Sequence, residues 1–199
     1  MEATEAICRL GREALAKLPT SEENLRLRVD LDLQLAKALD FLGHYDDGLE
    51  LLIETQSIAE QLDDEERIAR AYHWLGTMHW RRGENDEAIG IWRKQLALAK
   101  ELEDRAEIAN VCNSLGLAYD GKGEHDRAIE WFKKSLKISE ELEDRVGLAR
   151  TCWNIGLLYR DIGPYELARE YLERAKEIWE GLGYEKDVRE VEEILEGLG

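Results

Sequence analysis

Apolar residues along this chain recur mainly at steps of three and four residues, the spacing of one face of an α-helix. Ile108, Cys112, Leu115 and Tyr119 form one such face. Gly123 then predicts a helix end and a tight turn, after which a second apolar face begins. Only two prolines and almost no β-branched runs occur, which favours helices throughout. The pattern therefore predicts an all-α protein built from helix pairs.

The pattern also repeats every 40 residues. The segments 65–104 and 105–144 match without gaps at 15 of 40 positions, and 105–144 and 145–184 match at 12. An earlier segment, 25–64, is more divergent but keeps Gly43 and Asp46 in register. A fixed period of this length is typical of a solenoid, in which each helix pair packs on its neighbours.

Each of the last three segments carries a Leu-Gly or Ile-Gly pair with large and small residues at fixed distances from it. These residues are Tyr72, Leu75, Gly76, His79, Ala88 and Trp92, then Cys112, Leu115, Gly116, Tyr119, Ala128 and Phe132, then Cys152, Ile155, Gly156, Tyr159, Ala168 and Leu172. Their order resembles the tetratricopeptide repeat over about 160 residues. The period is longer than the usual 34 residues and the Pro that usually ends the second helix is absent, which implies longer second helices. This long variety is similar to the repeats of the Pins/LGN spindle-orientation adaptors and related bacterial regulators.

The resemblance implies a right-handed superhelical solenoid of antiparallel helix pairs with a capping helix at each end. The expected organisation is one domain, 1–199, with ten helices in one continuous superhelix. Its parts are an N-terminal capping helix in 1–24, repeats at 25–64, 65–104, 105–144 and 145–184, and a C-terminal capping helix in 185–199.

Both capping helices are predicted from amphipathic patterns. The first runs from Ala3 to Leu18 and is stopped by Pro19, and Thr20 with Glu23 predicts a capping box for the next helix. Its apolar face holds Ile7, Leu10, Ala14 and Leu18. The last runs from Lys186 to Leu198, with Val188, Val191, Ile194, Leu195 and Leu198 on one face and acids on the other. Terminal repeats of a solenoid need such a polar outer side.

Composition narrows the classes of partner. The 199 residues hold 44 acidic and 27 basic side chains, a net charge of −17, so nucleic acid is not an expected partner. Hydrophobic residues make up 44%, enough to fold the chain. No apolar run reaches the length of a membrane span, and no signal pattern opens the chain. Three widely spaced cysteines fit a reducing, cytoplasmic location.

The resemblance further implies that the first helix of each pair lines a concave binding groove. The lining positions hold five basic and four acidic side chains, about +1, and leave about −18 for all other positions. Three of the six Trp also fall there, and Trp and Arg dominate binding energy at protein interfaces. The candidate peptide-binding residues are Lys37, Arg70, His73, Trp74, Trp80, Arg81, Asn110, Asn113, Arg150, Trp153, Asn154 and Arg160.

We therefore expect a protein–protein interaction scaffold that binds a linear, acidic peptide or a helix of a partner. Side-chain amides pair with a peptide backbone, and Arg forks onto carboxylates. The alternatives are a self-associating structural module, hence a possible homo-oligomer, and a regulatory segment of a larger protein. No His pair has metal-ligand spacing and no glycine-rich phosphate loop occurs, so no enzyme, cofactor or metal is expected.

Several of these residues could have a structural role instead of a role in peptide binding. The groove Arg side chains could pair with groove Asp side chains across adjacent helices, and Trp74 and Trp153 could belong to the core. The Trp residues of the second helices are expected to pack in the interior; these are Trp92, Trp131 and Trp179. Cys112 and Cys152 share one repeat position and are expected to be small buried residues, too far apart for a disulfide.

Overall fold

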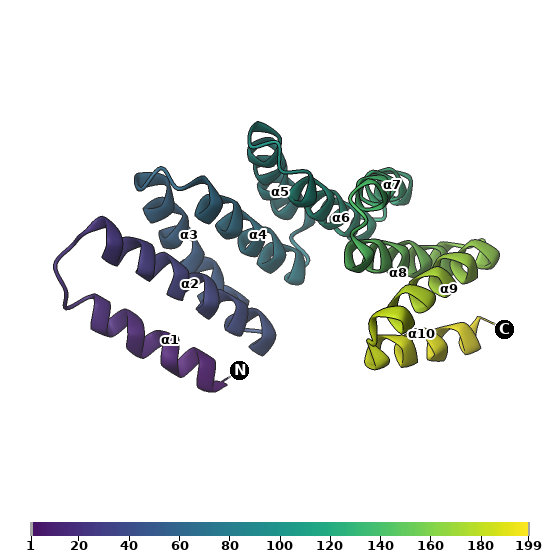
Figure 1. The fold of residues 1–199 in the computed structure, drawn as a ribbon, viewed down its shortest axis with the longest axis horizontal. Helices are drawn as coiled ribbons and strands as arrows, with labels where there is room; N and C mark the ends of the chain where they lie inside the picture. The colour runs from purple at the N-terminus through teal and green to yellow at the C-terminus, as the bar shows by residue number, and fades with distance from the viewer. Residues whose placement is uncertain (1, 199) are drawn as a thin grey trace. The chain divides into compact units, whose positions relative to one another are not determined.

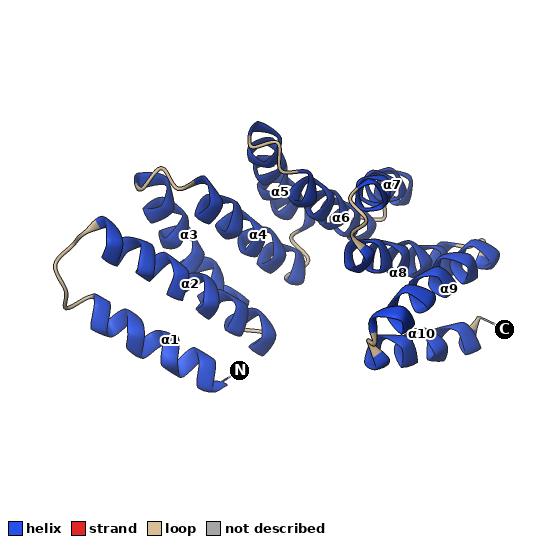
Figure 2. Ribbon diagram, viewed as in Figure 1, coloured by secondary structure: helices blue, strands red, loops and turns tan. Residues whose placement is uncertain are grey.

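The computed structural model describes residues 2–198, and over that range it consists of ten helices without a strand (Figures 1 and 2). The helices form two compact units that meet at Glu101 and Leu102 in the chain. The first unit holds α1 (Glu2–Leu15), α2 (Glu22–Leu42), α3 (Tyr45–Gln61), α4 (Glu65–Arg81) and α5 (Asn85–Glu101). The second holds α6 (Arg105–Gly121), α7 (His125–Glu141), α8 (Arg145–Ile162), α9 (Tyr165–Leu182) and α10 (Glu185–Gly197).

Each helix packs on the next one within its unit. The first helices of neighbouring repeats also lie side by side, α2 against α4 in the first unit and α6 against α8 in the second (Figure 1). This arrangement confirms the predicted all-α solenoid of helix pairs. The expected repeat boundaries and the single continuous superhelix stay predictions. The helices α4 to α7 each have 17 residues, so first and second helices of the two central repeats are equally long.

The turns between helices repeat with the same period as the sequence. Gly43, Gly83, Gly123 and Gly163 all have φ between 69° and 78°, in the left-handed region where glycine lacks the steric cost of a Cβ atom. Each follows a first helix. The turns that follow second helices place Asp63, Glu103 and Glu143 at φ of 51° to 56°. Gly123 therefore opens a turn as the sequence predicted.

An aspartate begins three of the first helices. Asp64, Asp104 and Asp144 lie 40 residues apart, and each accepts a hydrogen bond from the backbone N–H three residues later. Such a side chain satisfies a backbone donor that has no partner within the helix. In front of α2 the cap is Ser21, whose Oγ accepts from Asn24 N at 3.2 Å. The predicted Thr20–Glu23 capping box is wrong, because the helix starts one residue later than that pairing needs.

Small residues allow the two helices of a repeat to approach closely. A Cβ atom added to Gly116 would lie 2.5 Å from ring atoms of Phe132, and one added to Gly156 would lie 2.6 Å from Leu172 Cγ. Ala128, Phe132 and Leu172 are fully buried. The predicted close approach at Gly116 and Ala128 is confirmed, because the repeat sets a glycine on its first helix against a large side chain on its second.

The terminal helices differ from each other. On α10, Val188, Val191 and Leu195 pack into the core, and the outer face is polar, as predicted. On α1, however, Ile7 and Leu10 point outward. The polar outer side expected of a terminal repeat is therefore not found on α1, and the helix ends at Leu15 rather than Leu18.

The inner face of α1 is instead held by a buried charge cluster. Asp32 on α2 has no exposed surface, and Arg12 Nε lies 2.5 Å from its Oδ1. Arg28 Nε lies 3.7 Å from Asp32 Oδ2, and Thr55 Oγ1 lies 3.3 Å from the same oxygen. Glu54 on α3 contacts both guanidinium groups, at 3.3 Å from Arg12 and 2.5 Å from Arg28. Burial raises the pKa of the Asp32 carboxyl to about 6, although both arginines act to lower it.

Replacing Asp32 by asparagine is expected to change the pH dependence of stability. A carboxyl group whose pKa is 3.8 in the unfolded chain and about 6 in the folded chain holds its proton more tightly when folded. The stability from that proton is complete below the unfolded value and is lost as the pH rises through about 6. Between about pH 4 and about pH 7, Asp32→Asn should therefore gain roughly 2–3 kcal/mol relative to the parent protein. Urea unfolding at a series of pH values measures this difference, and parallel curves for the two proteins would contradict it.

Candidate functional site

The first helices carry the candidate residues, and the structure divides these residues between the two units. The first unit brings six of them together on α2 and α4: Lys37, Arg70, His73, Trp74, Trp80 and Arg81. The second unit brings the other six together on α6 and α8: Asn110, Asn113, Arg150, Trp153, Asn154 and Arg160. Each set is described by itself below.

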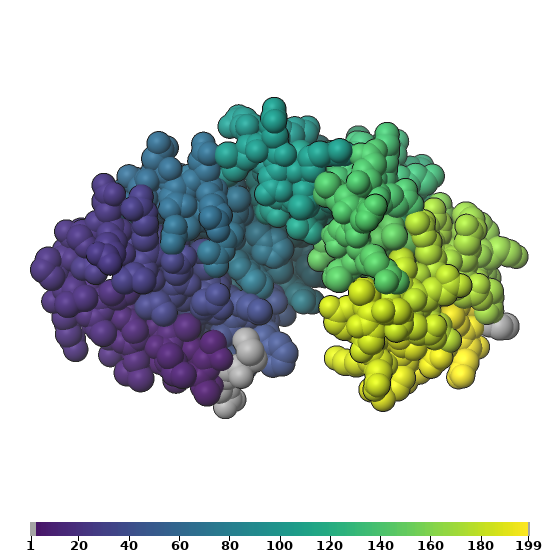
Figure 3. Space-filling model, viewed as in Figure 1, coloured from purple at the N-terminus to yellow at the C-terminus, as the bar shows by residue number. Residues whose placement is uncertain are grey.

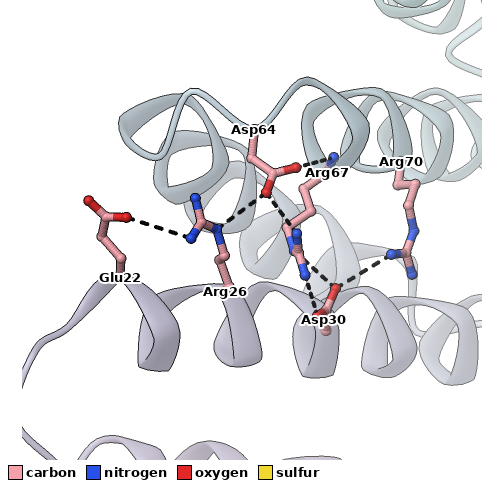
Figure 4. A network of polar contacts seen from close by, with 6 residues as sticks. All are labelled: Glu22, Arg26, Asp30, Asp64, Arg67 and Arg70. Carbon is pink, nitrogen blue, oxygen red and sulfur yellow. Dashed lines mark hydrogen bonds and ion pairs between the residues drawn. The ribbon is translucent and has the colours of Figure 1, made fainter.

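In the first unit an ion-pair network joins α2 to α4 (Figure 4). Arg67 Nη2 lies 2.6 Å from Asp30 Oδ2, its Nε donates to Asp30 Oδ1 at 3.1 Å, and its Nη1 lies 2.7 Å from Asp64 Oδ2. Arg70 reaches the same Asp30 carboxylate at 3.5 Å. Arg26 extends the network to Asp64 at 3.6 Å. Most of the positive charge on this face is therefore paired with carboxylates of the protein itself.

The network shifts the proton affinity of its members. The hydrogen bonds to Asp30 are the main reason that the pKa of the Arg67 guanidinium is raised. Partial burial acts to raise the pKa of Asp64, but the backbone N–H and guanidinium of Arg67 outweigh it and lower that pKa. Both residues are therefore held in their charged forms, which keeps α4 locked to α2 by a charge-assisted contact.

The remaining residues of the first-unit set have mixed roles. Arg81 Nε lies 3.4 Å from Asp40 Oδ1, and the Arg81 guanidinium stacks 5.1 Å from the centre of the Trp80 ring. Trp74 is half-buried against the core, edge-on to His73 with ring centres 5.1 Å apart. Lys37 is exposed and forms no ion pair with any described residue. Arg70 and Arg81 thus follow the alternative interpretation, in which groove arginines pair with groove aspartates.

In the second unit the equivalent contacts use amides instead of carboxylates. Arg150 Nη2 donates to Asn110 Oδ1 at 2.6 Å, and Asn154 Nδ2 donates to Asn113 Oδ1 at 3.0 Å. Arg150 is exposed, Asn110 and Asn154 are half-buried, and Asn113 is buried. The two hydrogen bonds run side by side from α8 to α6. Arg150 therefore keeps a full positive charge that no carboxylate in these two contacts neutralises.

The other two residues of the second-unit set, Trp153 and Arg160, are less available to a binding partner. Trp153 packs against the core, with its ring centre 5.6 Å from that of Trp179. Arg160 Nε donates to Asp161 at 2.7 Å, so its charge is paired within the groove set. Trp153 thus follows the alternative interpretation and is partly a core residue. The Arg160 pair lies within α8 and is not the pairing across adjacent helices that the alternative describes.

Residues predicted to be structural are largely in the interior. Trp92, Trp179, Cys112 and Cys152 are buried, and the cysteines are free thiols. Burial raises the pKa of the Cys152 thiol to about 11, so it stays protonated. Trp131 differs from the prediction, because it is only half-buried and carries Lys134 Nζ 3.9 Å above its ring.

Sequence reasoning missed Arg67, which makes the closest contacts to Asp30. Arg67 lies one helical turn before Arg70 and outside the lining positions that the repeat register gave. A signal was present, because Arg67 is the third residue after Asp64, at the start of a helix that faces α2. On α4 the lining positions begin at Arg70, one turn too late to include Arg67.

Other kinds of site are not found in the part of the chain that the structure describes. Over residues 2–198 no group of three or more His, Cys, Asp or Glu side chains is placed to hold a metal ion. Within the same range none of the helices combines the length and apolar character that crossing a bilayer requires.

Family models match the chain in three places. Models described as tetratricopeptide repeat match residues 33–97, 67–141 and 149–178, which together make up more than half of the chain. The chain belongs to the tetratricopeptide repeat family. The glycine-to-large-residue contacts described above are thus the packing contacts of its repeats. Comparison with curated proteins finds no match.

Solved structures share the fold. BtubC (BKLC) from P. vanneervenii is 17% identical with a TM-score of 0.74, over 99% of this chain and 90% of that one. The STAND protein PH0952 from Pyrococcus horikoshii, which has a tetratricopeptide repeat sensor, is 18% identical with a TM-score of 0.76 over 92% of this chain. A Rap protein complexed with Competence and Sporulation Factor is 21% identical with a TM-score of 0.60 over 86% of this chain. The chain spans 28% of PH0952 and 52% of the Rap protein.

Proposed function

We propose that this tetratricopeptide repeat protein is an interaction scaffold that binds a linear acidic peptide along α6 and α8. The single observation that carries the proposal is the pair of hydrogen bonds from Arg150 to Asn110 and from Asn154 to Asn113. They place one guanidinium that has no carboxylate partner beside the half-buried Asn154, whose amide oxygen can pair with a peptide backbone. The first unit is less suited to an acidic peptide, because Asp30 and Asp40 already occupy its arginines.

The contacts leave hydrogen-bonding capacity for a ligand. Asn154 uses Nδ2 as a donor to Asn113, and its own Oδ1 accepts no hydrogen bond from any described residue. That oxygen suits a peptide N–H. The Arg150 guanidinium has five N–H donors and spends one on Asn110, so two more can fork onto a carboxylate. Leu117 and Leu157, half-buried on the same helices, supply apolar surface beside these groups.

The comparisons support the proposal at the level of the fold. The Rap protein was solved with a bound factor and PH0952 uses its repeats as a sensor, so related solenoids serve as recognition elements. If this chain works as a segment of a larger regulator, α6 and α8 would form its input surface.

Reversing the charge at Arg150 is expected to weaken peptide binding by about 10-fold or more, because a carboxylate there repels an acidic ligand. Linear peptides selected from a displayed library against the parent protein supply the ligand, and fluorescence polarisation measures the affinities. The matched control is Arg169→Glu, an equal charge change at an exposed position on α9. Equal affinities for Arg150→Glu and Arg169→Glu would contradict the proposal, as would a library that yields no acidic binder.

A further inference from the structure

The outward side of α1 carries an apolar stripe. Ile7 and Leu10 are 67% and 65% exposed, and Ala3 and Ala14 are exposed on the same side of the helix. These positions follow one another at steps of four, three and four residues, so they form one continuous row along the helix. α1 lies at the edge of the first unit, with α2 on one side and no other helix of that unit on the other (Figure 1; purple in Figure 3). The stripe is therefore uncovered within the unit.

The outward faces of α7 and α10 are built differently. On α7 the exposed side is charged along its length, with Arg127, Glu130, Lys133 and Lys137. The outer face of α10 is also charged; its exposed residues include Glu185, Lys186, Arg189, Glu190, Glu192, Glu193 and Glu196. Charged faces of this kind are well solvated by water. Large apolar side chains two-thirds exposed in a row indicate a protein neighbour for α1 instead.

The stripe has the same composition when read in either direction. About the point midway between residues 8 and 9, Ala3 is opposite Ala14 and Ile7 is opposite Leu10. A second copy of α1 packed antiparallel would thus set Ile7 of each copy against Leu10 of the other, with alanines at both ends. The helix dipoles then also oppose each other favourably. A twofold contact needs this kind of self-complementary patch.

An isologous contact of this kind uses the same stripe on both copies. It therefore closes after two copies, because neither copy has a second such stripe on α1.

We propose that this protein forms a twofold homodimer in which α1 packs antiparallel against α1 of a second copy through Ala3, Ile7, Leu10 and Ala14. The dimer contact is separate from the proposed peptide-binding residues, which lie on α6 and α8. Either inference can therefore fail while the other holds.

Sedimentation of the full chain tests the proposal. The parent protein is expected to sediment at twice the chain mass, and Ile7→Glu with Leu10→Glu should weaken the dimer by about 100-fold or more, because four carboxylates would meet in the contact. Ile53→Glu is the matched control, since Ile53 on α3 is 64% exposed in the same unit but lies outside the stripe. Circular dichroism reports whether each variant keeps its helices. A parent protein that stays monomeric at all concentrations, a dimer that survives the double change, or assemblies larger than two would each overturn the proposal.

Engineered cysteines test the antiparallel direction. With Ala3→Cys and Ala14→Cys in one chain, mild oxidation should link the two copies, because residue 3 of one lies beside residue 14 of the other. Each single change should give no linked dimer. Linking by Ala3→Cys alone would indicate parallel helices and would overturn the proposed packing. The native Cys8, Cys112 and Cys152 are buried and serve as the background in the parent chain.

Discussion

Replacing Gly76 by alanine is expected to lower the free energy of unfolding by about 2–3 kcal/mol. A Cβ atom at this position would lie 2.2 Å from Trp92 Nε1 and 2.6 Å from Cδ1 and Cε2 of the same ring. Trp92 is 1% exposed and belongs to the neighbouring helix of the repeat, so the ring has no free space to move into. Alanine ordinarily stabilises a helix relative to glycine by roughly 0.5–1 kcal/mol. The clash outweighs that gain and reverses the sign.

The control for this prediction is Gly90→Ala on α5. Nothing lies within 4 Å of a Cβ atom added to Gly90. This change should therefore raise stability by roughly 0.5–1 kcal/mol, the ordinary effect of alanine in a helix. Urea unfolding followed by circular dichroism measures both variants. If both changes stabilised the protein, the close approach of α4 and α5 at Gly76 would be refuted.

Replacing Arg12 by alanine is expected to lower the free energy of unfolding by about 3–5 kcal/mol above neutral pH. The change removes the guanidinium 2.5 Å from Asp32, a carboxylate with no exposed surface. An ion left without its partner in the interior pays the full cost of desolvation. Arg28 remains 3.7 Å from Asp32 but also forms an ion pair with Glu54, so it replaces the lost Arg12 contact only in part. The loss should be smaller below about pH 6, where Asp32 carries a proton in both proteins.

Arg9→Ala on the same helix is the control. The Arg9 side chain is 48% exposed and pairs at 2.8 Å with Glu5, one turn away on the surface. Exposed pairs of this kind contribute only a few tenths of a kcal/mol, so this variant should unfold almost like the parent protein. Thermal unfolding of the two variants at two pH values provides the measurement. Equal losses for Arg9→Ala and Arg12→Ala would show that Asp32 does not depend on Arg12.

The sequence predicted the repeats well because their packing is local. The glycine of each Leu-Gly or Ile-Gly pair and the large residue 16 positions later, such as Gly116 and Phe132, meet within a single helix pair. Such contacts depend on residue size at fixed spacing. Aligning the sequence at its 40-residue period therefore shows which glycine meets which large side chain. The turn at Gly123 was also predictable from local sequence, since a left-handed backbone favours glycine.

The first helix shows where that reasoning ends. Its residues form a clear amphipathic pattern, and a terminal helix with such a pattern is expected to keep its polar side outward. In the structure, Cys8 and Arg12 face inward and Ile7 and Leu10 face outward. Periodicity shows that one face is apolar, but not which neighbour that face has. A buried carboxylate on α2 attracts Arg12 more strongly than the same site would attract an apolar side chain.

The sequence by itself determined the fold class, the helix pairs and the glycine contacts. Only the tertiary structure decided which charged side chains of the first helices are paired with carboxylates. Arg70 and Arg81 contact Asp30 and Asp40 from the preceding repeat, whereas Arg150 contacts the neutral Asn110. The physical reason is that an ion pair depends on a few ångströms between side chains of different helices. Residue types and spacing along one chain do not specify those distances.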